Sequence, residues 1–174
     1  MRETCGVPVE ALVARTGKEL PEPARQLLVH DQDMTSTLAA FHGSALRVEV
    51  LQRQQDDTLY FREVFLRTRS DDRIVEYGVI AIALEQFTPP QREAILAGET
   101  PLGELLHRFR IPFVSAPISF FSVSSASLGD RPFVQPAGAI CHGRFNRLGK
   151  PTGEPLAWIL EILPPASLPP ASLA

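Results

Sequence analysis

One acidic residue lies within the most apolar run of this chain and limits how that run can fold. The run extends from Leu156 to Leu163 and holds Glu161 among alanine, tryptophan, isoleucine and leucine residues. Successive side chains of a β-strand point to opposite faces, so Glu161 shares a face with Ile159 and Leu163. The pattern predicts a buried carboxyl group, which must take up a proton, because desolvation raises its pKa, or find a cation.

A second apolar run contains a cation in the same kind of position. This run covers residues 58–67 and alternates like a strand. Arg62 shares its face with Tyr60 and Val64. Together with Glu161, it predicts a small charged site inside a cavity lined by a sheet. A buried ion pair with a purely structural role is the alternative.

Length and charge narrow the class of protein. A chain of 174 residues suits one domain with a substantial core. Its net charge of −3 and its scattered Lys and Arg residues provide no basic surface for nucleic acid. Two cysteines make no disulfide framework, and neither a signal-type segment nor a run of roughly 20 apolar residues is present. We expect a cytoplasmic monomer or small homo-oligomer that binds neither nucleic acid nor membranes.

The spacing of apolar residues, with prolines, threonines and glycines at the ends, predicts the elements. Helices are expected over residues 8–15, 21–30, 33–43, 88–98 and 100–107. Strands are expected over residues 46–50, 58–67, 73–82, 111–129, 140–148 and 155–163. The uncharged run 111–129 is typical of a strand covered on both faces.

Polar turns at 55–57 and 69–72 make an antiparallel meander of the first three strands. Groups of strands separated by groups of helices predict an α+β fold. We expect one domain over residues 1–163, followed by a flexible proline-rich tail over residues 164–174.

Five groups of short segments follow one another along nearly the whole chain. They are Leu27-Leu28 with Asp33-Met34-Thr35, Phe61-Arg62-Glu63-Val64, the run from Ala97 to Leu106, Gly143-Arg144, and Gly153-Glu154-Pro155 leading to Glu161. In this order they resemble the chorismate pyruvate-lyase family, in its broader divergent branch. The resemblance implies a twisted antiparallel β-sheet with helical flaps over an enclosed pocket, and no metal or cofactor.

The family eliminates pyruvate from chorismate and leaves 4-hydroxybenzoate. By the resemblance, Arg62 would hold the ring carboxylate, and Glu161 would be the acid that faces the ether or hydroxyl end. Arginine binds carboxylates in bidentate fashion, and a buried acid can keep a proton to donate. Both roles agree with the buried charges that the residue pattern predicts.

Further substrate-binding positions follow from the same resemblance. Met34 and Leu102 would contribute main-chain N–H groups, with Thr35 and Gly103 beside them. Met34 and Thr35 belong to the helix expected over residues 33–43, and Leu102 and Gly103 belong to the helix expected over residues 100–107. They would place helical flaps over the ring substrate.

Chorismate is a dianion, so its second carboxylate needs another cation. Arg144 is the first candidate, with Arg147 and Arg73 as others, and solvent-facing strand arginines are the alternative interpretation. The stretch from Gly153 to Glu161 is one residue longer than the family spacing, so a bulge or register shift is expected there.

The cysteine and histidine residues give weaker evidence of a functional site. Cys141 and His142 are adjacent in a predicted strand, so their side chains point to opposite faces and cannot form a nucleophile and base pair. His30, His42 and His107 have no metal-ligand spacing, so no metal site is expected.

The predicted function is therefore that of a cofactor-free lyase acting on chorismate or a related carboxylated ring. Two alternatives stay open. One is a specialised-metabolism enzyme that uses the same fold for a different small molecule. The other is a stand-alone small-ligand-binding module, because fold analogy does not carry substrate identity.

Overall fold

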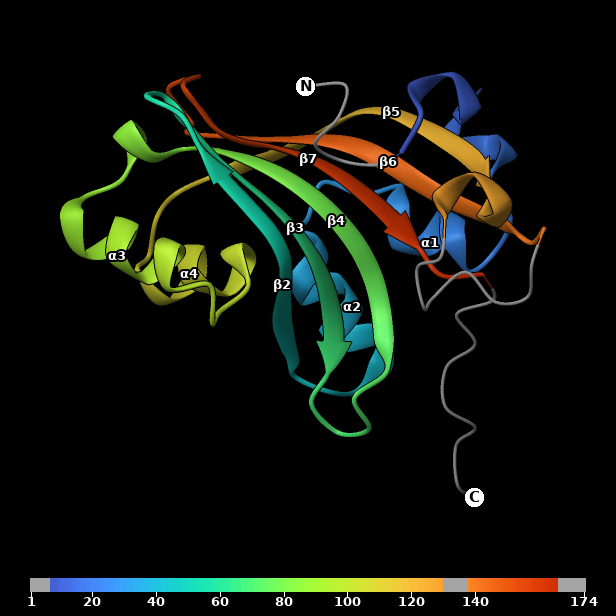
Figure 1. Ribbon diagram of the computed structural model, residues 1–174, viewed down its shortest axis with the longest axis horizontal. Coiled ribbons are helices and arrows are strands. Elements are labelled where there is room, and N and C mark those ends of the chain that lie inside the picture. The colour runs from blue at the N-terminus through green and yellow to red at the C-terminus, as the bar shows by residue number, and fades with distance from the viewer. Residues whose placement is uncertain (1–6, 130–137, 166–174) are drawn as a thin grey trace.

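The computed structural model describes residues 7–129 and 138–165, and a seven-stranded sheet organises them (Figure 1). The strand order is β1-β5-β6-β7-β4-β3-β2, and every neighbouring pair is antiparallel. The strands are β1 (Val13–Arg15), β2 (Leu46–Gln55), β3 (Leu59–Thr68), β4 (Ile74–Ala83), β5 (Val114–Ser124), β6 (Ile140–Gly149) and β7 (Pro155–Leu163).

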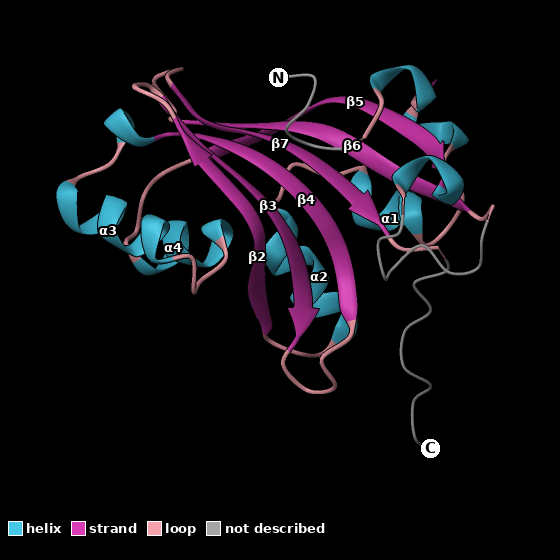
Figure 2. Cartoon of the chain, in the orientation of Figure 1, coloured by secondary structure: helices cyan, strands magenta, loops and turns pink. Residues whose placement is uncertain are grey.

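Four α-helices accompany the sheet in the described residues (Figure 2). They are α1 (Ala24–Leu28), α2 (Met34–His42), α3 (Pro89–Ala97) and α4 (Leu102–Arg108). Short 3-10 turns lie at Val9–Ala11, Gly17–Glu19, Leu84–Gln86 and Ser125–Leu128. The α+β prediction and the antiparallel meander β2-β3-β4 are confirmed.

Local signals explain where two of the helices begin and end. Asp33 caps α2 by accepting a hydrogen bond from the Ser36 N–H at 2.8 Å, and Gly43 ends the helix with a φ of 60°. Thr88 opens α3 with a capping box, and Gly98 ends it with a φ of 71°. Both helices match the predicted ranges closely.

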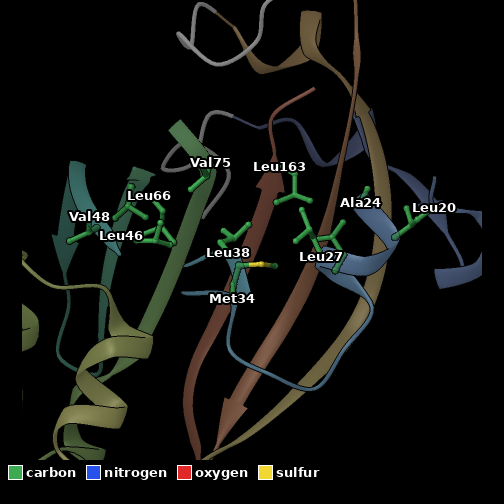
Figure 3. Close-up of a cluster of buried hydrophobic side chains, with 12 residues drawn as sticks. Leu20, Ala24, Leu27, Met34, Leu38, Leu46, Val48, Leu66, Val75 and Leu163 are labelled. Carbon is green, nitrogen blue, oxygen red and sulfur yellow. The ribbon is translucent and has the colours of Figure 1, made fainter. Parts of the chain in front are cut away.

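The four helices cover one face of the sheet with two apolar clusters. Around α1 and α2, the side chains of Met34 and Leu38 lie between those of Leu66 and Leu27 (Figure 3). A second cluster joins α3 and α4 to the same face through residues such as Ile80. The opposite face packs against the N-terminal segment and the turn at residues 125–128.

Two predictions about single elements are wrong. Residues 8–15 form a 3-10 turn and the edge strand β1 rather than a helix, because this strand pairs with β5. The start of β5 is not covered on both faces: Val114 is 52% exposed and Ile118 is 63% exposed. Because β1 reaches only the last part of β5, the first half of that strand is a sheet edge.

The expected irregularity before Glu161 is present. Leu148 pairs with Ala157, whereas the next residue of β6, Gly149, pairs with Pro155. One residue of β7 is therefore extra at this point, as in a β-bulge. Most of the predicted tail over residues 164–174 lies outside the described residues.

Candidate functional site

A cavity lies between the helix-covered face of the sheet and the first residues of α2 and α4. Its lining is Asp33, Met34, Thr35, Val48, Arg62, Val64, Leu66, Glu76, Gly78, Ile80, Pro101, Leu102, Gly103, Asn146, Leu148, Ile159 and Glu161. It contains about 520 Å³ of space free of protein atoms, mouth included, of which about 50 Å³ can take the centre of a water-sized molecule. Its lining is largely apolar with a few charged groups, which is the composition common to small-molecule sites.

Strand register brings the charged residues of the sheet onto this one face. Glu161 of β7 lies opposite Gly78 of β4, and Arg62 of β3 lies opposite Ile80 of β4. Side chains two residues apart on a strand share a face. The two residues singled out by their apolar surroundings therefore line the same cavity, although they lie in distant parts of the sequence.

Arg62 is buried without a complete set of partners. Its side chain is 3% exposed, and its Nε and Nη1 atoms have no hydrogen-bond partner among the described residues. Burial lowers the pKa of Arg62 from its ordinary value, although a guanidinium stays charged in proteins. The cavity thus contains a cation with free donors.

Glu161 is also buried, at 2% exposed, but it has a cation of its own. Its Oε2 accepts a hydrogen bond from Nε of the fully buried Arg144. Arg144 also donates to the carbonyl oxygens of Leu28 at 2.9 Å, His30 at 3.1 Å and Gln32 at 3.3 Å. Desolvation raises the pKa of Glu161, and the Arg144 charge opposes that rise. The partner of Glu161 is therefore Arg144.

Glu76 is a third buried ionisable group in the cavity, and the sequence analysis missed it. Its side chain is 4% exposed, and its Oε2 atom has no hydrogen-bond partner among residues 7–129 and 138–165. Burial, followed by the Glu161 charge, raises the pKa of Glu76 well above its ordinary value. The signal was the one that identified Glu161: an acid within a β-branched, strand-like run.

A polar contact joins the two helices above the cavity. Nε2 of His107 in α4 lies 2.9 Å from Oδ2 of Asp33, the residue that caps α2. Gly103 lies against the same carboxylate, because a β-carbon at this position would overlap Asp33 Oδ1. The starts of α2 and α4 are therefore held together directly over the sheet.

Six of the seven predicted site residues line the cavity: Met34, Thr35, Arg62, Leu102, Gly103 and Glu161. Met34 and Leu102 are the first residues of α2 and α4, where N–H groups have no acceptor within the helix. Arg144 is the exception, because it lies behind Glu161 and its side chain bonds to protein groups. The functional roles of these residues remain predictions.

The other candidate residues lie elsewhere. Arg147 donates to the Gly153 carbonyl oxygen at 2.5 Å, and Arg73 lies 3.6 Å from Asp71, so neither lines the cavity. Cys141 is buried in the core of the opposite face, and burial raises its pKa to about 11. In the described part of the chain, no group of three or more His, Cys, Asp or Glu residues could hold a metal ion.

The seven-stranded antiparallel sheet with its few helices on one face is consistent with the chorismate lyase-like fold. Among solved structures, the protein is similar to the gene product SA0254 of Staphylococcus aureus, with a TM-score of 0.52. The two share 15% sequence identity over 76% of this chain and 87% of that chain.

Another similar structure is that of the possible transcriptional regulator YydK of Bacillus subtilis, with a TM-score of 0.49 and 8% identity. That match covers 70% of this chain and 58% of YydK. No family model and no curated protein matches the sequence. Within the described residues, no helix is long and apolar enough to span a membrane.

Proposed function

We propose that the cavity binds a small carboxylated ring and that the protein is a cofactor-free lyase acting on chorismate or a related ring. The observation that carries this proposal is the buried guanidinium of Arg62, whose Nε and Nη1 lack partners among the described residues. Removing a charge from water without pairing it costs several kcal/mol. A ligand carboxylate at this position supplies the missing partner.

The apolar part of the lining suits a ring. Val64, Ile80 and Ile159 line the cavity together with Arg62 and the acids, and Ile80 and Ile159 lie in one row of the sheet with Arg62. A flat apolar ring fits between such side chains, while its carboxylate forms a bidentate pair with the guanidinium. The N–H groups at the starts of α2 and α4 are further donors for ligand oxygens.

The lyase reaction balances without an oxidant or a reductant. The bond between the ring and the ether oxygen breaks, and the ring loses one proton as it becomes aromatic. The enol leaves with a proton from the acid on its oxygen, then takes up one proton at carbon, returns the oxygen proton and becomes pyruvate, and 4-hydroxybenzoate remains. Arg62 would anchor the ring carboxylate, and Glu161 would be the acid near the departing oxygen, where burial raises its pKa.

A second candidate function is ligand binding without turnover. The ion pair with Arg144 favours the charged form of Glu161 and so weakens it as a proton donor. A cavity with one anchoring cation and a locked carboxylate can hold a ring carboxylate without cleaving it. This observation favours a small-ligand-binding module.

One experiment separates the two functions. The purified protein is mixed with chorismate, and pyruvate is followed through its reduction by lactate dehydrogenase. The lyase proposal predicts pyruvate release by the wild type and by Arg110→Met, which changes an exposed arginine just after α4, and none above background by Arg62→Met. Calorimetric titration with benzoate and 4-hydroxybenzoate accompanies the assay. Binding without pyruvate supports the binding module, and absence of both binding and pyruvate contradicts both candidates.

A further inference from the structure

Glu76 lies where it can touch a molecule in the cavity. It belongs to β4 and pairs across the sheet with Leu66 of β3. Its carboxyl group leans over Gly78, because a β-carbon at that glycine would lie 3.1 Å from Glu76 Oε1. Gly78 is also the residue opposite Glu161. The Glu76 carboxyl group therefore lies on the floor of the cavity, beside the Glu161 position.

Among the described residues, no cation forms an ion pair with this carboxyl group. Arg144 is committed to Glu161 and to three main-chain carbonyl oxygens. Arg62 lies opposite Ile80, four residues further along β4 than Glu76. Glu76 Oε2 is left without any hydrogen-bond partner at 4% exposure. A buried polar atom in that state destabilises the folded protein unless a ligand satisfies it.

The charges facing Glu76 decide which of the two glutamates holds a proton. Glu161 has the Arg144 guanidinium against it, whereas Glu76 faces the carboxylates of Glu161 and Asp33. Burial and these acids raise the pKa of Glu76, and Arg144 opposes the rise only in part. The ion pair with Arg144 therefore favours the charged form of Glu161, and burial beside that charge favours the neutral form of Glu76. A neutral carboxyl group can donate its O–H.

We propose that Glu76 is a second ligand-contacting carboxyl group, which selects ring carboxylates with a hydroxyl or keto oxygen at the end opposite the carboxylate. The inference rests on the proposed function, because it takes Arg62 as the anchor of the ligand carboxylate. It adds a specificity-determining residue that acts at the other end of the ring.

The spacing of the two groups suits one six-membered ring. Four residues of β4 separate Ile80, the partner of Arg62, from Glu76, or about 13 Å at roughly 3.3 Å per residue. The Glu76 side chain leans toward Gly78 and so toward Arg62, which shortens the gap between the charged ends. A ring with substituents at opposite positions spans more of this spacing than a ring with adjacent substituents does.

The protonation state also selects the ligand group. A carboxylic acid donates its O–H to a hydroxyl or keto oxygen, and its carbonyl oxygen accepts from a hydroxyl. An ammonium group would need the ionised acid, which the neighbouring Glu161 disfavours. An oxygen substituent is therefore the expected partner.

The test uses isothermal titration calorimetry with three probes: benzoate, 4-hydroxybenzoate and 2-hydroxybenzoate. The last has its hydroxyl next to the carboxylate and serves as the positional control. The proteins are the wild type, Glu76→Leu, Glu76→Gln, Arg62→Met and the exposed-acid control Glu93→Gln. Thermal melting of each variant checks folding. The wild type is expected to bind 4-hydroxybenzoate about tenfold more tightly than either other probe.

Glu76→Leu should abolish that preference and leave benzoate affinity within about threefold, whereas Glu76→Gln, which keeps a donor, should largely preserve the preference. If Glu76→Leu retains the full preference, or if the wild type shows none, the inference is overturned while the Arg62 anchor stands. If Arg62→Met binds benzoate as well as the wild type does, the proposed anchor fails, and the inference that rests on it fails with it.

Discussion

The two buried arginines of the cavity region should respond to the same substitution in opposite ways. Arg144 pairs with Glu161 and donates to three main-chain carbonyl oxygens before α2. Arg144→Met leaves the Glu161 carboxylate buried without its cation, a change that costs roughly 3–5 kcal/mol. For a chain of this size each kcal/mol lowers the melting temperature by about 2–4 °C, so a fall of roughly 6–20 °C is expected.

Arg62→Met removes a guanidinium whose Nε and Nη1 have no partner in the described structure. Each buried donor left unpaired costs about 1–3 kcal/mol, and methionine fills the space with apolar atoms. The melting temperature should therefore stay unchanged or rise by a few degrees, as is common when a binding residue is replaced by an apolar one.

Differential scanning calorimetry and urea unfolding measure this difference in both variants, with Arg110→Met as the exposed control. The reasoning requires a clear gap in stability between the two buried variants. If Arg62→Met lowers stability as much as Arg144→Met does, Arg62 is part of the structural network and loses its place as a ligand anchor.

Three further predictions concern the acids of the cavity. Under the lyase proposal, Glu161→Gln should lower turnover of chorismate by roughly 10²–10⁴ with affinity kept within about tenfold; unchanged turnover would remove Glu161 from the chemistry. Because the pKa of Glu76 is raised above its ordinary 4.5, its cost to the folded state is absent below that pH and grows as the pH rises toward the folded-state value. Urea unfolding from pH 4 to pH 8 should therefore show a stability gain of Glu76→Gln over wild type that increases with pH, and a constant difference would refute the shift. Asp33→Ala should cost about 1–2 kcal/mol through loss of the α2 cap and the His107 contact, and an unchanged unfolding midpoint would contradict that role.

The elements that the sequence predicted well are those set by local signals. The helix at residues 33–43 has its cap and its glycine stop within the same short stretch. The failed helix at residues 8–15 shows the limit, because Val13–Arg15 pairs with Phe120–Ser122 across the sheet. An apolar pattern over so few residues fits both a short helix and an edge strand, and the distant pairing decides between them.

In the candidate site, too, the residues with a local signal could be predicted, and those placed by distant strand pairing could not. Arg62 and Glu161 could be identified from the sequence, because a charged residue within an apolar strand is unusual whichever strand lies beside it. The cation for Glu161 could not be chosen from the sequence, since Arg144 reaches it through the register of β6 and β7. Glu76 was overlooked although its own strand-like run carries the same signal as that of Glu161, and its place in the cavity follows from the register of β3, β4 and β7.

Gly143, the residue before Arg144, limits which substitutions the neighbouring strands can accept. A β-carbon there would overlap the Glu161 carbonyl oxygen and lie 2.5 Å from Cζ of Phe121 on the neighbouring strand. A larger residue at this position therefore requires a smaller one at Phe121 and a shift of β7, which carries Glu161. Gly143, Phe121 and the backbone of β7 at Glu161 are therefore positions that can change only together.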